Sequence, residues 1–166
     1  MVNAKYVIST ILILTLLVSA ASAASLTVGS KATYKTIQSA VNAAHGGDTI
    51  NVLAGTYPEQ VIIRDNRFYI VGQPGKYPTV YGFEMGQSTN ALGAADINGF
   101  KITKYGVVGG RFSGNTIRNN YFVNCGVAGG EGFWNNNFVN NQFTNGGIRL
   151  YAGSRDNVVT GNTFYK

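Results

Sequence analysis

The acidic side chains are the residues of this sequence best suited to acid–base or metal chemistry. There are seven: Asp48, Glu59, Asp65, Glu84, Asp96, Glu131 and Asp156. Hydrolysis of a polysaccharide needs two carboxyl groups across the scissile bond, and a calcium-dependent lyase needs several carboxylates on one ion. These acids are scattered singly, so no catalytic residues are assigned. Asp65, Glu84 and Asp96 lie in a less regular region and could meet after folding, which keeps a lyase or hydrolase of acidic polysaccharide as the alternative.

Ligands for transition metals are scarce. The chain has one histidine, His45, and one cysteine, Cys125, and Met85 is the only methionine besides Met1. Two soft or imidazole ligands at a suitable spacing are therefore missing, and we expect neither a metal nor a cofactor. A single cysteine also excludes an intramolecular disulfide.

One group of residues could bind a sugar. Arg155 follows Trp134 by the interval at which nearby segments repeat, so the two side chains should be neighbours in the fold, beside Asn135 and Asp156. An aromatic face with such polar groups can stack on and hydrogen-bond to a sugar ring. Tyr151 is a weaker candidate of the same kind. The competing interpretation is a cation–π pair with a purely structural role.

Asparagine-rich segments recur at a fixed interval of 21 residues. They read NTIRNNYFVN from Asn115, NNFVNNQFTN from Asn136 and NVVTGNTFYK from Asn157. Two apolar columns run through the copies, five residues apart within each copy. They are Ile117, Phe138 and Val159, and Phe122, Phe143 and Phe164. Strand alternation cannot place residues five apart on one face, so a sharp bend must separate two short strands.

The bends explain the asparagine doublets. Gly99, Asn119, Asn140 and Gly161 occupy the first bend position, and glycine and asparagine are the residues that tolerate positive φ. Asn120, Asn141 and Asn162 come next, where stacked amides can hydrogen-bond from coil to coil. We therefore predict a structural ladder of Asn119, Asn120, Asn140, Asn141 and Asn162.

The repeats predict an all-β parallel solenoid of roughly six coils of about 20–21 residues. A third column, Val107, Val127 and Ile148, follows glycine each time. Upstream, the apolar spacing of TIQSAVNAA predicts an amphipathic helix over 36–45, which could cap the first coil. Thr36 is its expected N-cap, and Gly46-Gly47 its expected end.

The first 23 residues have the pattern of a secretory signal peptide. Lys5 precedes an apolar run, and small residues at 21–23 suit a cleavage site. We expect residues 24–166 to form a single secreted or cell-surface domain without a stable membrane span. An uncleaved N-terminal anchor is the alternative.

Composition narrows the partners. Hydrophobic residues make up 45 % and charged residues 12 %, which excludes a disordered chain. The net charge of +6 comes from scattered single residues, so nucleic-acid binding is not expected. Attraction to acidic polysaccharide or an anionic surface remains compatible with it.

A family resemblance supports the solenoid. The segment YKTIQSAVNAAHGGDTINVLAGTYPEQVII (34–63) resembles the opening of right-handed parallel β-helix proteins of the pectin-lyase-like superfamily. INGFKIT (97–103) and the asparagine-rich segments resemble the β-helix repeats of NosD-like surface proteins of archaea and bacteria. The resemblance implies a right-handed β-helix over nearly the whole mature chain. GTYPE (55–59) is similar to an element of pectin methylesterases, but their catalytic motifs are absent, so the resemblance does not imply that activity.

The expected role is a structural or binding module for envelope polysaccharide or a surface protein. No polar cap follows Phe164 in the printed sequence, although solenoid ends ordinarily need one. Self-association through this C-terminal coil, within an extracellular assembly, is a further expectation.

Overall fold

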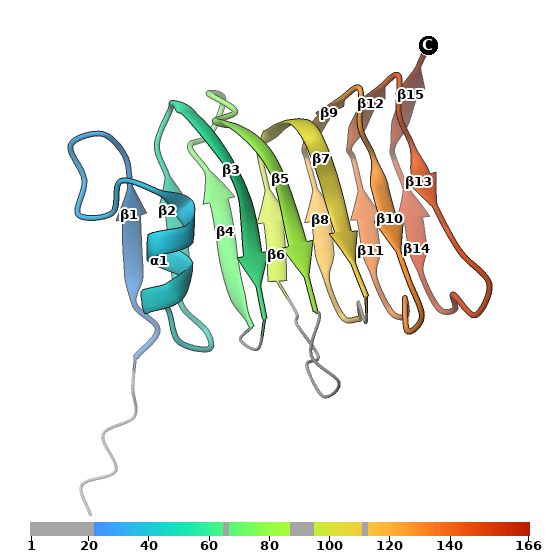
Figure 1. The fold of residues 1–166 in the computed structure, drawn as a ribbon, viewed down its shortest axis with the longest axis horizontal. Helices are drawn as coiled ribbons and strands as arrows, with labels where there is room; N and C mark the ends of the chain where they lie inside the picture. The colour runs from blue at the N-terminus through green and yellow to red at the C-terminus, as the bar shows by residue number, and fades with distance from the viewer. Residues whose placement is uncertain (1–21, 65–66, 87–94, 111–112) are drawn as a thin grey trace, which may run out of the picture.

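A computed structural model describes residues 22–64, 67–86, 95–110 and 113–166. The chain forms a parallel β-solenoid of about six turns, whose coils succeed one another along its long axis (Figure 1). One sheet, the first sheet, contains β1 (Ser25–Val28), β2 (Thr49–Val52), β4 (Phe68–Gly72), β6 (Ala95–Asn98), β8 (Thr116–Arg118), β11 (Asn137–Val139) and β14 (Val158–Thr160). The second sheet contains β3 (Thr56–Ile63), β5 (Thr79–Met85), β7 (Lys101–Gly109), β9 (Tyr121–Val123), β10 (Val127–Gly129), β12 (Gln142–Thr144), β13 (Ile148–Arg149) and β15 (Thr163–Tyr165).

The strand register confirms the apolar columns read from the sequence. In the first sheet Ile97, Ile117, Phe138 and Val159 pair in succession. In the second sheet Ile102, Phe122, Phe143 and Phe164 do the same. The phenylalanine rings of this second column stack nearly parallel, with centroids 4.5 and 5.0 Å apart. Stacking one coil on the next therefore builds the core from continuous columns of similar apolar side chains.

The predicted bends are present in the described coils. Asn119 and Asn140 both have φ of 54°, and Gly99 and Gly161 have φ of 81° and 64°. An asparagine tolerates this left-handed conformation better than other residues with a side chain. The bend turns the chain from the first sheet into the second, and at Asn119, Asn140 and Gly161 it lies between two strands of three residues each.

The predicted amide ladder is present in part: it joins Asn120, Asn141 and Asn162, whereas Asn119 and Asn140 are exposed at the bend. Asn141 Oδ1 accepts hydrogen bonds from the backbone N and Nδ2 of Asn120, at 3.0 and 3.2 Å. Asn162 Oδ1 receives the same pair of bonds from Asn141, both at 2.9 Å. Asn120 and Asn141 are buried, so these bonds satisfy amides that would otherwise be costly to enclose.

A second amide ladder was missed in the sequence. Asn115 donates from its backbone N and Nδ2 to Asn136 Oδ1, at 3.1 and 2.9 Å. Asn136 donates in the same way to Asn157 Oδ1, at 3.0 Å each. These asparagines open the three repeated segments, so the signal was present. Each coil of the repeat thus has a ladder asparagine at two corners.

The helix is shorter than predicted. α1 spans Ile37–Ala43, and Thr36 is its N-cap, accepting a hydrogen bond from Ser39 N at 3.1 Å. The helix ends before Gly46 because His45 N donates to the Asp48 carboxylate, at 2.7 Å, instead of continuing the helical pattern. Ile37, Ala40 and Val41 are buried in the same core as the strands.

Candidate functional site

Glu59 and Asp48 both accept hydrogen bonds from backbone N–H groups. Glu59, on β3, accepts hydrogen bonds from the N-terminal helix amides of Ile37 and Gln38, at 2.7 and 3.0 Å. It therefore stabilises the start of α1, a role that the sequence did not suggest. Asp48 accepts from two backbone N–H groups, those of Ala24 and His45.

The candidate acid–base residues lie apart or beside arginines. Glu84 lies 3.6 Å from Arg64, and Asp96 forms a bidentate pair with Arg118, with a closest contact of 2.8 Å. Asp65 lies outside the described residues. Within the described ranges no three His, Cys, Asp or Glu side chains gather as a metal site would require.

Trp134 and Arg155 meet as the register predicted. They form a parallel bridge, and the Arg155 guanidinium carbon lies 4.3 Å from the indole centroid. The indole N–H donates to the carbonyl of Gly153 at 3.0 Å. One ring face and the polar edge of Trp134 are thus already engaged by the neighbouring coil.

The other predicted sugar-binding residues have varied positions. Asn135 and Asp156 stack at a left-handed corner, with φ of 54° and 56°, and both are exposed. Arg155 Nε lies 3.9 Å from the carboxylate of Asp156. Tyr151 is exposed on a turn closed by a hydrogen bond from Ser154 N to its carbonyl. The described contacts therefore join Trp134, Arg155, Asn135 and Asp156, but they do not bring Tyr151 to this group.

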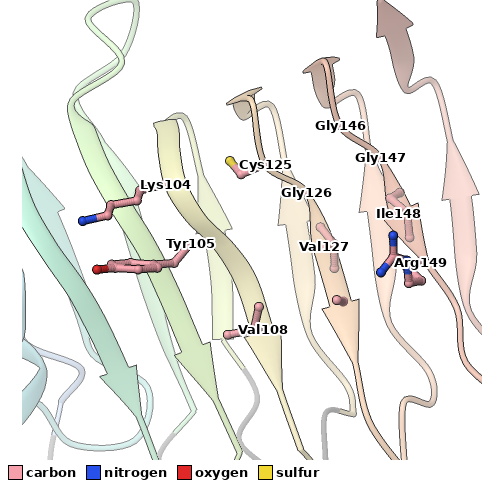
Figure 2. A pocket seen from close by; sticks show the side chains of 11 residues that line it. Lys104, Tyr105, Val108, Cys125, Gly126, Val127, Gly146, Gly147, Ile148 and Arg149 are labelled. Carbon is pink, nitrogen blue, oxygen red and sulfur yellow. The ribbon is translucent and has the colours of Figure 1, made fainter.

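A wider open groove, of about 430 Å³, lies over β7, β10 and β13 of the second sheet. Figure 2 shows Lys104 and Tyr105 on one side of it, Arg149 on the other, and the backbone of Gly126 and Gly147 between them. Sequence reasoning did not identify this groove.

Stacked glycines include two residues of the groove lining, Gly126 and Gly147. Gly82, Gly106, Gly126 and Gly147 lie in register, and we call them the glycine column. A Cβ on Gly106 or Gly126 would overlap the carbonyl oxygen of the next glycine. No side chain can therefore rise from those positions without pushing the coils apart.

Side-chain size falls along the neighbouring column, and this opens one end of the groove. In successive coils the residue before the glycine column is Tyr105, then Cys125, then Gly146. Burial raises the pKa of the Cys125 thiol, and its sulfur lies 3.3 Å from the carbonyl oxygen of Ile102. The thiol therefore stays protonated at neutral pH and is poorly suited to act as a nucleophile.

The lining residues of the groove carry positive charge. Lys104 and Arg149 are exposed, and none of the lining side chains is acidic. The Lys104 ammonium lies 5.0 Å from the ring centroids of both Tyr81 and Tyr105. Hydrogen bonding with Tyr105 raises the pKa of Lys104, so the ammonium stays charged at neutral pH. An exposed tyrosine ring with one cation beside it and a second across the groove suits a flat ligand with anionic groups.

The parallel strands, the coil register and the stacked columns of buried side chains define a β-solenoid protein. The family described as "Right handed beta helix region" matches residues 10–164. The chain therefore belongs to this family. No curated protein and no solved structure matches the chain. Among the described residues, no helix is both long and apolar enough to cross a membrane.

Proposed function

We propose that this protein is a secreted or cell-surface module that binds acidic polysaccharide in the groove over β7, β10 and β13. The observation that carries the proposal is that Lys104 and the exposed ring of Tyr105 line one side of the groove and Arg149 the other, without an acid among the lining residues (Figure 2). Uronate-type carboxylates would meet the two cations, and a sugar ring would lie against the tyrosine.

Several features support this choice over a catalytic role. The net charge of +6 favours encounter with a polyanion. Glu84 and Asp96, which could have served as acid and base, face arginines instead. The predicted signal peptide is consistent with an envelope polysaccharide as the ligand. A lyase or hydrolase remains the alternative, and release of shortened or unsaturated oligosaccharides would reveal it.

The test is titration calorimetry of residues 24–166 with a galacturonate hexamer at low salt. The double variant K104A/R149A should bind roughly 5- to 30-fold more weakly, because it loses two solvent-exposed ion pairs. Lys101→Ala is the matched control: it removes a charge from the same strand, β7, outside the groove, and should change affinity less than twofold. Equal affinity of the double variant and the wild type would contradict the proposal, as would tight binding of a neutral glucan hexamer.

The cluster of Trp134, Arg155, Asn135 and Asp156 is the competing candidate for sugar binding. Trp134→Ala in the same titration separates the two faces. We expect it to leave affinity within about twofold of wild type, because Arg155 and Gly153 already engage the indole. A large loss of affinity in this variant alone would move the binding site to that face.

Self-association with a second copy is a further proposal, made for a separate surface. In the coil of β14 and β15, Val159 and Phe164 are 46 % and 52 % exposed. Light scattering of residues 24–166 should show a dimer that Phe164→Lys converts to monomer, because a buried charge opposes apolar docking. Tyr69→Lys, at a similarly exposed aromatic residue on β4, is the control and should stay dimeric. A monomer at all concentrations would refute this proposal.

Two finer features of the fold are proposed with it. We infer that the solenoid winds right-handed, as the family's description and the usual handedness of parallel crossovers suggest. We also infer that α1 caps the first coil. Gln38 supports this role, because its side chain donates to Ile62 O at 3.1 Å and accepts from Ile62 N on β3.

A further inference from the structure

Asp48 is a buried carboxylate without a strong cationic partner. Its residue is 4 % exposed, and its two oxygens accept hydrogen bonds from the backbone N–H groups of Ala24 and His45, both at 2.7 Å. The His45 ring lies 3.9 Å away, but that side chain is 90 % exposed. Among the described residues no other cation lies within ion-pair distance of this carboxylate. A buried charge of this kind ordinarily has a paired positive charge.

Ala24, the donor to Asp48 Oδ1, is also the first residue after the predicted cleavage site. Residues 22–24 are exposed and lie outside secondary structure, and β1 begins at Ser25. The carbonyl of Ala24 accepts a hydrogen bond from Thr49 N at 2.8 Å, which fixes this residue beside β2. The nitrogen of Ala24 is therefore held against the carboxylate by the sheet itself.

We propose that cleavage of the Ala23–Ala24 peptide bond creates an α-ammonium group that forms a buried ion pair with Asp48. A signal peptidase would add water across the bond, leaving a carboxylate on Ala23 and a protonated amine on Ala24. The amine nitrogen already lies at hydrogen-bond distance from Asp48 Oδ1, so pairing needs no rearrangement of the chain. Processing thereby adds the positive charge that the carboxylate lacks, and completes the first coil.

The ion pair predicts a pH window of stability. Asp48 raises the folded-state pKa of the α-ammonium above its unfolded value of about 7.7–8.0. This contribution is fully present below that value and is lost as the pH rises through the folded pKa. The backbone hydrogen bond from His45 N lowers the pKa of Asp48 most, and the bond from Ala24 N lowers it further. Its contribution is present above the ordinary carboxyl pKa and is lost as the pH falls through the lowered one.

The groups around this site do not obscure the effect. His45 is the titratable side chain nearest to Asp48, and its side chain is 90 % exposed. From the neighbouring strand, Arg67 and Tyr69 contact this segment through backbone bonds, Gly47 N to Arg67 O and Tyr69 N to Asp48 O. A stability change between about pH 8 and 10 should therefore report the amine.

The test compares three forms of the chain by thermal unfolding across pH. The first begins at Ala24 with a free amine, the second begins at Ala24 with an acetylated amine, and the third retains residues 21–23. At pH 7 the free form should melt roughly 3–6 °C above the other two, because only it has the charge. The acetylated form keeps an N–H donor, so it isolates the charge. The difference should vanish above about pH 10, where the amine is neutral.

Two further measurements complete the test. Asp48→Asn should abolish the difference in melting temperature between the free and acetylated forms. The comparison is made over the pH range in which both forms of this variant unfold cooperatively. The intact mass of the chain secreted by its own leader should correspond to a start at Ala24. Equal melting temperatures of the free and acetylated wild-type forms at pH 7 would overturn the proposal, whether or not the Asp48 variant folds. A secreted chain that starts at another residue would also overturn it.

Discussion

Replacing Asn141 by Leu is expected to lower the free energy of unfolding by roughly 4 kcal/mol, because it strands several buried polar groups at once. The Asn141 amide donates to Ile117 O and to Asn162 Oδ1, at 2.8 and 2.9 Å. Its oxygen accepts from the backbone and side chain of Asn120. Leucine has a similar volume but can make none of these bonds, so the apolar gain cannot offset the loss. Urea unfolding followed by the fluorescence of Trp134 measures the change.

Asn137→Leu is the matched control, with the same chemical change in the same coil. Asn137 is exposed on β11, so this substitution should alter the free energy of unfolding by about 0.5 kcal/mol or less. If Asn141→Leu were as mild as this control, the amide ladder would not contribute to stability.

Replacing Gly126 by Ala is expected to destabilise the protein by about 3 kcal/mol, because the new methyl group would overlap the backbone of the next coil. The overlap is with the carbonyl oxygen of Gly147, which accepts the hydrogen bond from Val127 N at 2.8 Å. The backbone cannot retreat without breaking this bond and those of its neighbours in the sheet. The melting temperature and the urea midpoint should both fall.

Gly147→Ala is the control for this prediction, one coil further along the glycine column. A Cβ at Gly147 would have Phe164 Cε1 as its nearest atom, at 4.0 Å, an ordinary contact distance. We expect a change of about 1 kcal/mol or less. Equal destabilisation by the two substitutions would contradict the role of coil spacing, because only Gly126 has the overlap.

Much of the fold could be predicted because the same apolar spacing and the same bend residues recur in each coil. The spacing of five between apolar residues required a bend, and asparagine or glycine at the bend required positive φ, which Asn119 and Asn140 have. The second ladder has a sequence signal too, because Asn115 and Asn136 open their segments in the same register. The length of α1 depended on the hydrogen bond from His45 N to the Asp48 carboxylate, three residues further on, which the apolar spacing of the helix does not reveal.

The groove was harder to predict than the fold. Gly126 and Gly147 line it, and the sequence shows them only as the glycines that precede Val127 and Ile148. The same alignment, shifted by one residue, gives the shrinking series Tyr105, Cys125 and Gly146 that opens it. The predicted pair of Trp134 and Arg155 shows a different limit of the sequence. The register places the two side chains together, but it does not predict which other groups hydrogen-bond to them. The carbonyl of Gly153, which accepts the indole N–H, comes from an irregular turn.

Amide hydrogen exchange of residues 24–166, with and without a galacturonate hexamer, would show directly whether acidic sugar binds in the groove. We expect slowed exchange in the segments around Lys104, Gly126 and Arg149, which line the groove on three successive coils. We expect unchanged exchange around Trp134 and in the first sheet. Protection centred on Trp134, or no protection at saturating hexamer, would contradict binding in the groove.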